Sequence, residues 1–321
     1  MSSELVIAYY DASPDTTRQE RWQALLTPLL GTFRMVGLLD AAAEQAQIAL
    51  VWSPPTGRLA QLSALKLIIS LGQGVDHLMR EPDLPKSAHI VRLVDPNMSH
   101  ALSQWVILNI LDHYREGRLY RAYRAEKAFI QRPQIETAGL AVAVYGMGAI
   151  GQVIASQLAG LGFDVHGWSR TKRDFGSQIT AYHGSDGFRQ LTQTCRCHVC
   201  ILPLTPETEG LFSAEIFNSM PTGALFINGG RGKQVVEADL LAAIRSGQLG
   251  GAALDVFAVE PLPDSHPFWD EPNITIWPHV AAQTNPETAA RQVASAITSV
   301  LAGKRPENLV DLVRGYWARG Y

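Results

Sequence analysis

Short apolar runs alternate with segments of helical periodicity along almost the whole chain. The runs that predict strands are 4–10, 47–52, 65–70 and 89–94 in the N-terminal part, and 140–146, 163–169, 197–204, 224–230, 250–257 and 273–279 in the remainder. Strands that alternate with helices are typical of an α/β fold with parallel sheets. Residues 285–303 predict a C-terminal helix that is opened by Asn285, with Pro286 at its first position.

The chain is long enough for two domains. It has 321 residues, of which 46% are apolar, whereas a single domain usually has about 100–150 residues. A long helical pattern from about Ser99 to Tyr123 follows the first block of strands. We expect this helix to form a rigid crossing into the second block.

A glycine motif lies between two predicted elements of the second block. Residues 146–151 read Gly-Met-Gly-Ala-Ile-Gly, directly after a predicted strand and directly before a predicted helix. In that context the motif indicates a dinucleotide site: Gly146 permits a tight turn, Gly148 lets the backbone approach a diphosphate, and Gly151 allows close helix–strand packing. The amides at the helix start favour the diphosphate charge. A glycine-rich turn without a ligand is the weaker alternative.

The end of the next predicted strand bears on the choice of dinucleotide. An NAD site usually has Asp or Glu there, about 20 residues after the glycines, to bind the ribose hydroxyls. This chain instead has Ser169, Arg170, Thr171 and Lys172, followed by Arg173. A hydroxyl and several cations suit a 2′-phosphate, so we expect NADP(H) to be preferred, with NAD(H) possible. A solvated basic turn is the alternative.

Charge and hydropathy exclude several classes of protein. The net charge of −3 argues against a partner such as nucleic acid or a membrane surface. No stretch approaches the roughly 18 apolar residues of a membrane helix, and the N-terminal sequence MSSELVIAYYD lacks the pattern of a signal peptide. Three cysteines, an odd number, suit a reducing compartment, so we expect a cytoplasmic protein.

The cysteines raise the alternative of a metal site. Cys195, Cys197 and Cys200 lie beside His198, but no second ligand cluster with zinc-like spacing occurs elsewhere in the chain. We therefore expect a buried strand whose thiols pack as small apolar groups, and no metal.

Several longer motifs follow one another in a characteristic order. They are GQGVD at 72–76, LPLTPETEGLF at 202–212, FINGGRG at 226–232, ALDVFAVEPLP at 253–263, HPFW at 266–269 and WPHVAAQT at 277–284. In order and spacing they resemble the D-isomer-specific 2-hydroxyacid dehydrogenase family over nearly the whole chain. The WSR turn at 168–170 and the RGY sequence at 319–321 are similar to its glyoxylate/hydroxypyruvate reductase A branch.

The resemblance implies an architecture of two Rossmann-like domains with parallel sheets. The NAD(P)-binding Rossmann domain, expected at 101–285, would be inserted into a discontinuous, flavodoxin-like substrate-binding domain made of 1–100 and 286–321. Members of the family are usually homodimers that pair through their cofactor domains, and the region near residues 105–135 would contribute.

The resemblance also assigns catalytic residues. Arg231 would bind the substrate, His279 would act as acid/base, and Glu260 would be its partner. These residue types suit a 2-oxo acid: a guanidinium can hold a carboxylate and the adjacent carbonyl, and a protonated imidazole can give its proton to the carbonyl oxygen as hydride arrives. A nearby carboxylate favours the protonated form of an imidazole and orients its ring. Singly, each residue could instead serve a loop or a strand end.

Further contacts are implied by the same resemblance. The cofactor would lie against Gly146, Gly148, Ala149, Ile150, Gly151, Ser169, Arg170, Thr171, Lys172, Leu202, Pro203, Gly229, Gly230, Arg231, Asp255, His279 and Ala281. The substrate would meet Arg231, His279, the amides of Gln73 and Gly74, and the side chains of Trp52 and Met98, although Trp52 and Met98 could equally be core residues. Two positions depart from the family pattern: Gln104, where Glu is frequent, and Gly230, where a small residue larger than glycine is common.

The activity implied is reduction of glyoxylate and hydroxypyruvate to glycolate and D-glycerate with NADPH. Trp52, Met98 and Trp277 would restrict the pocket if they crowd the carbonyl side of Arg231. Two alternatives stay open: a reductase of larger 2-oxo acids such as phenylpyruvate or branched-chain analogues, and a non-enzymatic NAD(H)-sensing corepressor of the same family.

Overall fold

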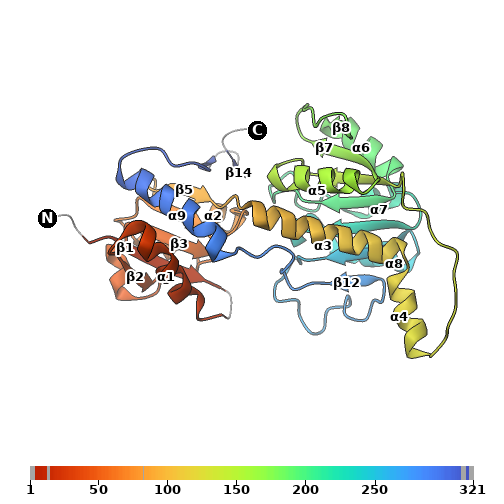
Figure 1. Ribbon diagram of the computed structural model, residues 1–321, viewed down its shortest axis with the longest axis horizontal. Helices are drawn as coiled ribbons and strands as arrows, with labels where there is room; N and C mark the ends of the chain where they lie inside the picture. The colour runs from red at the N-terminus through yellow and green to blue at the C-terminus, as the bar shows by residue number, and fades with distance from the viewer. Residues whose placement is uncertain (1–3, 13–14, 82, 312–315, 318–321) are drawn as a thin grey trace. The chain divides into compact units, whose positions relative to one another are not determined.

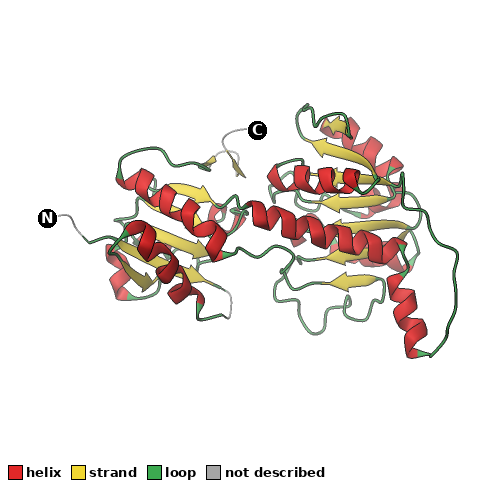
Figure 2. Cartoon of the chain, in the orientation of Figure 1, coloured by secondary structure: helices red, strands yellow, loops and turns green. Residues whose placement is uncertain are grey.

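The computed structural model describes residues 4–12, 15–81, 83–311 and 316–317 (Figure 1). The first three residues of the N-terminal segment and the RGY sequence at 319–321 lie outside the described residues. The chain forms two compact units: unit 1 is Met1–Met98 with Gln283–Tyr321, and unit 2 is Ser99–Ala282. Figure 2 shows that helices and strands alternate in both.

Unit 1 is built on a five-stranded parallel sheet. Its elements are β1 (Val6–Asp11), α1 (Arg18–Leu30), β2 (Arg34–Gly37), β3 (Ile48–Trp52), β4 (Leu67–Ser70), α2 (Asp76–Met79), β5 (His89–Arg92), α9 (Pro286–Leu301), β13 (Val310–Asp311) and β14 (Tyr316–Trp317), with 3-10 helices at Ala41–Gln45 and Leu59–Gln61. The strand order, β2-β1-β3-β4-β5, is the flavodoxin-like one. Trp22 of α1 and Ile297 of α9 pack on one face of the sheet, and Leu78 of α2 packs on the other.

Unit 2 is built on a seven-stranded parallel sheet. Its elements are α3 (Pro96–Tyr114), α4 (Gly117–Ala125), β6 (Ala141–Tyr145), α5 (Ala149–Gly160), β7 (Asp164–Ser169), β8 (Ile179–His183), α6 (Gly184–Thr194), β9 (Cys197–Cys200), α7 (Ala214–Ser219), β10 (Ala224–Asn228), α8 (Glu237–Arg245), β11 (Leu249–Leu254) and β12 (Ile274–Ile276), with a 3-10 helix at Gly232–Gln234. From β8 inward the order β8-β7-β6-β9-β10-β11 is that of a Rossmann fold, and β12 extends it.

Helices cover both faces of this second sheet, as a parallel sheet requires. Val106 of α3 and Ile154 of α5 pack on the face that carries Val142 and Val144 of β6. Alternate residues of β6 point the other way, where Tyr145 joins a core that includes α6, α7 and α8. The α/β fold with two parallel sheets is therefore confirmed, and among the described residues no helix is long and apolar enough to cross a membrane.

The sequence prediction was wrong about the long helix. Instead of one helix from Ser99 to Tyr123, α3 ends at Tyr114 and α4 begins at Gly117. Glu116 between them has a left-handed φ of 55°, and its carboxylate accepts two hydrogen bonds from Arg132 at 2.8 and 2.9 Å. A Cβ at position 117 would overlap the carboxylate of Asp112 in its present position, so a larger residue there would displace that side chain.

The sequence runs missed four of the described strands. β13 and β14 are two-residue strands that pair with each other, and β2 and β8 lie at edges of the two larger sheets. The residues of β8 are exposed or half-buried, so this strand lacks the continuous apolar run by which the buried strands were recognised. The C-terminal helix was predicted correctly: Asn285 caps α9 by accepting a hydrogen bond from the Glu287 amide at 3.1 Å.

Candidate active site

The predicted site residues of unit 2 all follow strands of one parallel sheet. The glycine motif follows β6, Leu202 and Pro203 follow β9, residues 229–231 follow β10, residues 255–260 follow β11, and His279 follows β12. These five strands are neighbours in the sheet. Because parallel strands end at the same edge, the motifs are gathered at the carboxyl edge, where open α/β sheets bind their ligands.

The glycine motif forms the turn between β6 and α5. Gly146 has φ 106°, and a Cβ there would lie 2.6 Å from the Ile201 carbonyl oxygen. A Cβ on Gly151 would collide with the Gly146 carbonyl. A Cβ on Gly148, in contrast, would meet no atom within 4 Å, and no side chain caps α5 at this end. The space beside Gly148 and the amides of Ala149 and Ile150 therefore fit a dinucleotide diphosphate.

The basic turn lies next to the glycine motif. The Trp168 carbonyl accepts hydrogen bonds from the amides of Gly146 and Met147 at 3.1 and 3.3 Å, which brings the end of β7 against that motif. Beyond it, the Ser169 hydroxyl donates to the Thr171 carbonyl at 2.8 Å. The charge of Arg170 contributes to lowering the pKa of Glu207, after hydrogen bonds from Thr205 and the Glu207 amide. Arg170 therefore lies close enough to Glu207 for its positive charge to act on that carboxylate.

The loop after β10 holds Arg231. Buried Asn228 fixes its turn: Asn228 Oδ1 accepts from the Gly230 amide and Asn228 Nδ2 donates to the Arg231 carbonyl, both at 3.0 Å. Arg231 Nη1 donates to the Gly230 carbonyl at 2.8 Å, and the Arg231 amide donates to Gln234 Oε1 at 2.8 Å. The sequence reasoning missed Asn228 and Gln234. A polar residue ending the apolar run of β10 was a signal for Asn228, but nothing in the sequence distinguished Gln234.

His279 and Glu260 form a hydrogen-bonded pair. His279 Nδ1 lies 2.8 Å from Glu260 Oε2, while Glu260 Oε1 accepts from the Phe257 amide at 2.9 Å. Burial raises the pKa of Glu260, but the hydrogen bond and charge of His279, together with Arg231, outweigh it and leave that pKa below its ordinary value. The carboxylate is therefore ionised at neutral pH and faces the imidazole.

Asp255 fixes the backbone of the histidine. The Asp255 carbonyl accepts from the His279 amide at 2.9 Å, and its Oδ1 accepts from the Val280 and Ala281 amides at 2.8 and 3.0 Å. His279 has a left-handed φ of 55°, a conformation that costs a residue with a side chain about 1–3 kcal/mol. The three hydrogen bonds help to offset that strain. Burial of Asp255 raises its pKa, although the two amides act in the opposite direction.

Of the predicted substrate residues in unit 1, Trp52 ends β3, Gln73 and Gly74 follow β4, and Met98 lies in the first turn of α3. A Cβ on Gly72 would overlap the Trp52 ring, which also packs edge-on against His77 with centroids 4.8 Å apart. The Ser70 hydroxyl donates to the Gly74 carbonyl at 2.9 Å; Gln73 is buried and Gly74 is half-buried. Met98 is also buried, and its sulfur accepts a hydrogen bond from Thr284 at 3.4 Å.

The cysteines lie in the interior of unit 2. All three are buried free thiols, and burial raises their pKa values above the ordinary range. His198 is buried as well, and burial lowers its pKa to about 3; its Nδ1 lies 3.0 Å from the Tyr145 hydroxyl. Within the described part of the chain, no group of three or more His, Cys, Asp or Glu side chains is arranged to hold a metal ion.

Comparison with known proteins identifies relatives along the whole chain. The family model described as "D-isomer specific 2-hydroxyacid dehydrogenase, NAD binding domain" matches residues 107–281. A glyoxylate/hydroxypyruvate reductase A from Yersinia enterocolitica is 36% identical over 92% of this chain and 96% of its own.

Solved structures of the same family also superpose on this chain. A D-isomer specific 2-hydroxyacid dehydrogenase from Xanthobacter autotrophicus, crystallised with NADPH and MES, is 37% identical and superposes with a TM-score of 0.89 over 98% of this chain and 100% of its own. An NADPH-dependent glyoxylate/hydroxypyruvate reductase from Sinorhizobium meliloti, crystallised with NADP and sulfate, is 34% identical with the same TM-score and coverage. The chain belongs to the D-isomer specific 2-hydroxyacid dehydrogenase family.

Proposed function

We propose that the protein reduces small 2-oxo acids, glyoxylate and hydroxypyruvate, to glycolate and D-glycerate with NADPH. The observation that carries this proposal is the pairing of His279 with an ionised Glu260 in the loops that follow β11 and β12, adjacent to the strand that supplies Arg231. The relatives from Yersinia and Sinorhizobium, which bear the name glyoxylate/hydroxypyruvate reductase, support the choice of substrate.

The residues of unit 2 have distinct tasks in this reaction. When bound, the nicotinamide supplies a hydride to the carbonyl carbon. The Arg231 guanidinium binds the substrate carboxylate and polarises its carbonyl oxygen. His279, whose Nδ1 faces Glu260, donates a proton from Nε2 to that oxygen as negative charge develops there. Glu260 orients the ring and stabilises the imidazolium before the transfer. Hydride and proton together convert the carbonyl to a secondary or primary alcohol.

The cofactor proposal rests on the two loops described above. The glycine motif with the start of α5 would hold the diphosphate, and Ser169, Arg170, Thr171 and Lys172 would hold the 2′-phosphate of NADPH. Leu202, Pro203, Gly229, Gly230, Asp255 and Ala281 are proposed to line the same cofactor site. The roles of Trp52, Gln73, Gly74 and Met98 as substrate contacts, and of unit 1 as the substrate-binding domain, are proposals carried by the family resemblance.

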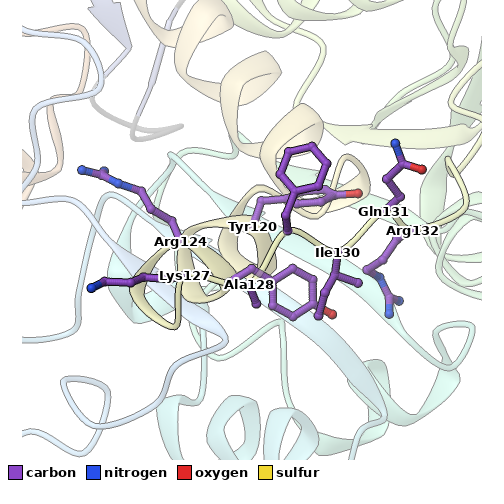
Figure 3. Close-up of a pocket in the computed structure, with 9 residues that line it drawn as sticks. Tyr120, Arg124, Lys127, Ala128, Ile130, Gln131 and Arg132 are labelled. Carbon is purple, nitrogen blue, oxygen red and sulfur yellow. The ribbon is translucent and has the colours of Figure 1, made fainter.

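A homodimer is also proposed, with α4 and the segment after it as the contact region. None of the side chains of α4 is buried, and four apolar residues of this region are exposed: Tyr120, Phe129, Ile130 and Ile135. Figure 3 shows Tyr120, Ile130 and their neighbours around a hollow, with Arg124, Lys127 and Arg132 beside it. Phe129 is 96% exposed, and clustered apolar side chains of this kind mark association surfaces.

The location proposed for the protein is the cytoplasm. Its three cysteines are free, buried thiols, although Cys197 and Cys200 lie only a few residues apart. Unpaired cysteines of this kind are typical of a reducing compartment.

The substrate proposal predicts a preference for small acids. At a fixed NADPH concentration, kcat/KM for hydroxypyruvate should exceed that for phenylpyruvate and 2-oxoisocaproate by about tenfold or more, because a bulky group in a small pocket costs about 1–3 kcal/mol of strain. Steady-state NADPH oxidation measures this. Tenfold preference for a bulky acid would favour the larger-substrate alternative, and no turnover of any 2-oxo acid would favour the corepressor alternative.

The acid/base proposal predicts a shifted pH profile for Glu260→Gln. In that variant the protonated imidazole loses an opposite charge 2.8 Å away, so the alkaline limit of the reduction should move to lower pH. The acidic side should change little, since Glu260 is already ionised in the unaltered protein above its lowered pKa. kcat/KM measured from pH 5 to 10 tests this, with the exposed Glu215→Gln as control. An alkaline limit identical in both variants would contradict the coupling.

The cofactor proposal predicts a selective defect in Arg170→Ala. Loss of a charge-assisted contact worth roughly 1.5–3 kcal/mol should raise the KM for NADPH about tenfold to a hundredfold and that for NADH much less. Arg189→Ala, which removes an exposed arginine from α6, should leave both KM values unchanged. Equal efficiency of the two cofactors in the unaltered enzyme would exclude a 2′-phosphate site.

The dimer proposal predicts that Phe129→Glu produces a monomer. A charge in the middle of an apolar contact surface has to be desolvated on association and opposes it. Light scattering during gel filtration gives the mass directly. Leu161→Glu places the same charge on another exposed apolar residue of unit 2, 55% exposed, and should leave the mass at that of a dimer. A monomeric unaltered protein, or a dimeric Phe129→Glu variant, would contradict the proposal.

A further inference from the structure

Gln234 is a fully buried amide in the loop of Arg231, and all of its hydrogen-bonding positions are used. Its Oε1 accepts from the Arg231 amide at 2.8 Å and from the Cys200 thiol at 3.3 Å. Its Nε2 donates to the Leu202 carbonyl at 2.9 Å and the Pro203 carbonyl at 3.1 Å. A primary amide has two donors and about two acceptor positions, so this side chain is saturated. Its surroundings also fix its orientation, with the oxygen toward the donors and the nitrogen toward the carbonyls.

These contacts connect two loops that have different tasks in the proposed reaction. Leu202 and Pro203 follow β9 on the cofactor side, and Arg231 follows β10 on the substrate side. The backbone of Gln234 is fixed too, since its carbonyl accepts from the Phe212 amide at 2.9 Å. Burial raises the pKa of the Cys200 thiol to about 12, so it remains a protonated donor. Gln234 therefore bridges the two loops from a rigid base.

The same amide explains the unusual glycine at position 230. A Cβ on Gly230 would lie 2.5 Å from Gln234 Oε1 and 2.9 Å from the Leu202 carbonyl oxygen, one of the groups that Gln234 binds. The φ of Gly230 is not in the left-handed region, so its backbone conformation does not require glycine. The space that a larger residue would fill is taken by the amide of Gln234.

We propose that Gln234 is a positioning residue that holds Arg231 in place relative to the Leu202–Pro203 segment. Position 230 is then a glycine because a Cβ there would overlap the amide of Gln234. The inference rests on the proposed function, in which Arg231 binds the substrate carboxylate. Loss of the bridge leaves the Arg231 amide and two carbonyls without their buried partner, so the loop shifts and the guanidinium is misplaced.

The principal variant is Gln234→Met, which keeps the length of the side chain and removes every hydrogen bond. We expect the KM for hydroxypyruvate to rise about tenfold to a hundredfold at saturating NADPH, while the Kd for NADPH, measured by fluorescence titration, changes less than about threefold. The matched control is Gln248→Met. Gln248 Nε2 also donates to two carbonyls, those of Phe217 and Met220, but Gln248 precedes β11 at the amino edge of the sheet. The control should lose stability and keep its KM.

The pairing of Gln234 with Gly230 is tested by a double-mutant cycle. Gly230→Ala alone should displace the amide and raise KM. In the Gly230→Ala/Gln234→Met double variant the amide is already absent, so the rise should be clearly smaller than the product of the two single effects. A KM for Gln234→Met no higher than that of Gln248→Met, or a double variant equal to the product, would overturn the inference. If Gln234→Met does not yield protein that binds NADPH, Gln234→Asn, whose shorter amide cannot reach both loops, takes its place in the same comparison.

The cycle also separates this inference from the proposed function. Absence of NADPH-dependent reduction by the unaltered protein would contradict the function alone. The cycle would then be measured on the urea midpoint of unfolding, where non-additive effects of the two substitutions support the bridge and additive effects refute it.

Discussion

All strands of the seven-stranded sheet run in the same direction, so each loop that leaves a carboxyl end emerges at the same edge. Such a sheet has to be covered on both faces, and it is: α3 and α5 pack on one face and α6, α7 and α8 on the other. The strand interiors therefore contain few polar groups, and thiols that could have been ligands, such as Cys197, are packed as apolar residues. The polar groups that could bind ligands or transfer protons therefore lie at the carboxyl edge, where the chain leaves the sheet.

Buried polar side chains hydrogen-bond the backbone of the loops at that edge. Asn228, Gln234 and Asp255 are almost fully buried, and each binds backbone groups of a loop that carries a candidate catalytic residue. A buried amide or carboxylate is unfavourable unless its hydrogen bonds are made, so each of these side chains permits only a narrow range of loop conformations. In the proposed reaction this rigidity keeps Arg231 and His279 in place before a substrate arrives.

Two residues at this edge have positive φ angles. His279 has a left-handed φ, and Gly146 has a φ of 106° against the Ile201 carbonyl. The conformation of His279 persists only where the surroundings hold it, and here they include the hydrogen bonds of Asp255, whereas at Gly146 the absence of a side chain permits the turn. The carboxylate of Glu260 adds a charge that the imidazole of His279 faces directly.

The sequence by itself determined the fold class and ten of the strands, because strand periodicity is a local property of the chain, and the order of its motifs carried the family resemblance that names Arg231, Glu260 and His279 as candidates. The tertiary structure decided what depends on distant residues meeting. It divided the predicted long helix at Glu116, whose carboxylate binds Arg132, and it added β8, whose partner β7 compensates for a weak apolar pattern. It also brought His279 to Glu260 across nineteen residues and placed Gln234 against Leu202 across thirty-two. No local pattern encodes such contacts, because strand order and the packing of loops at the sheet edge create them.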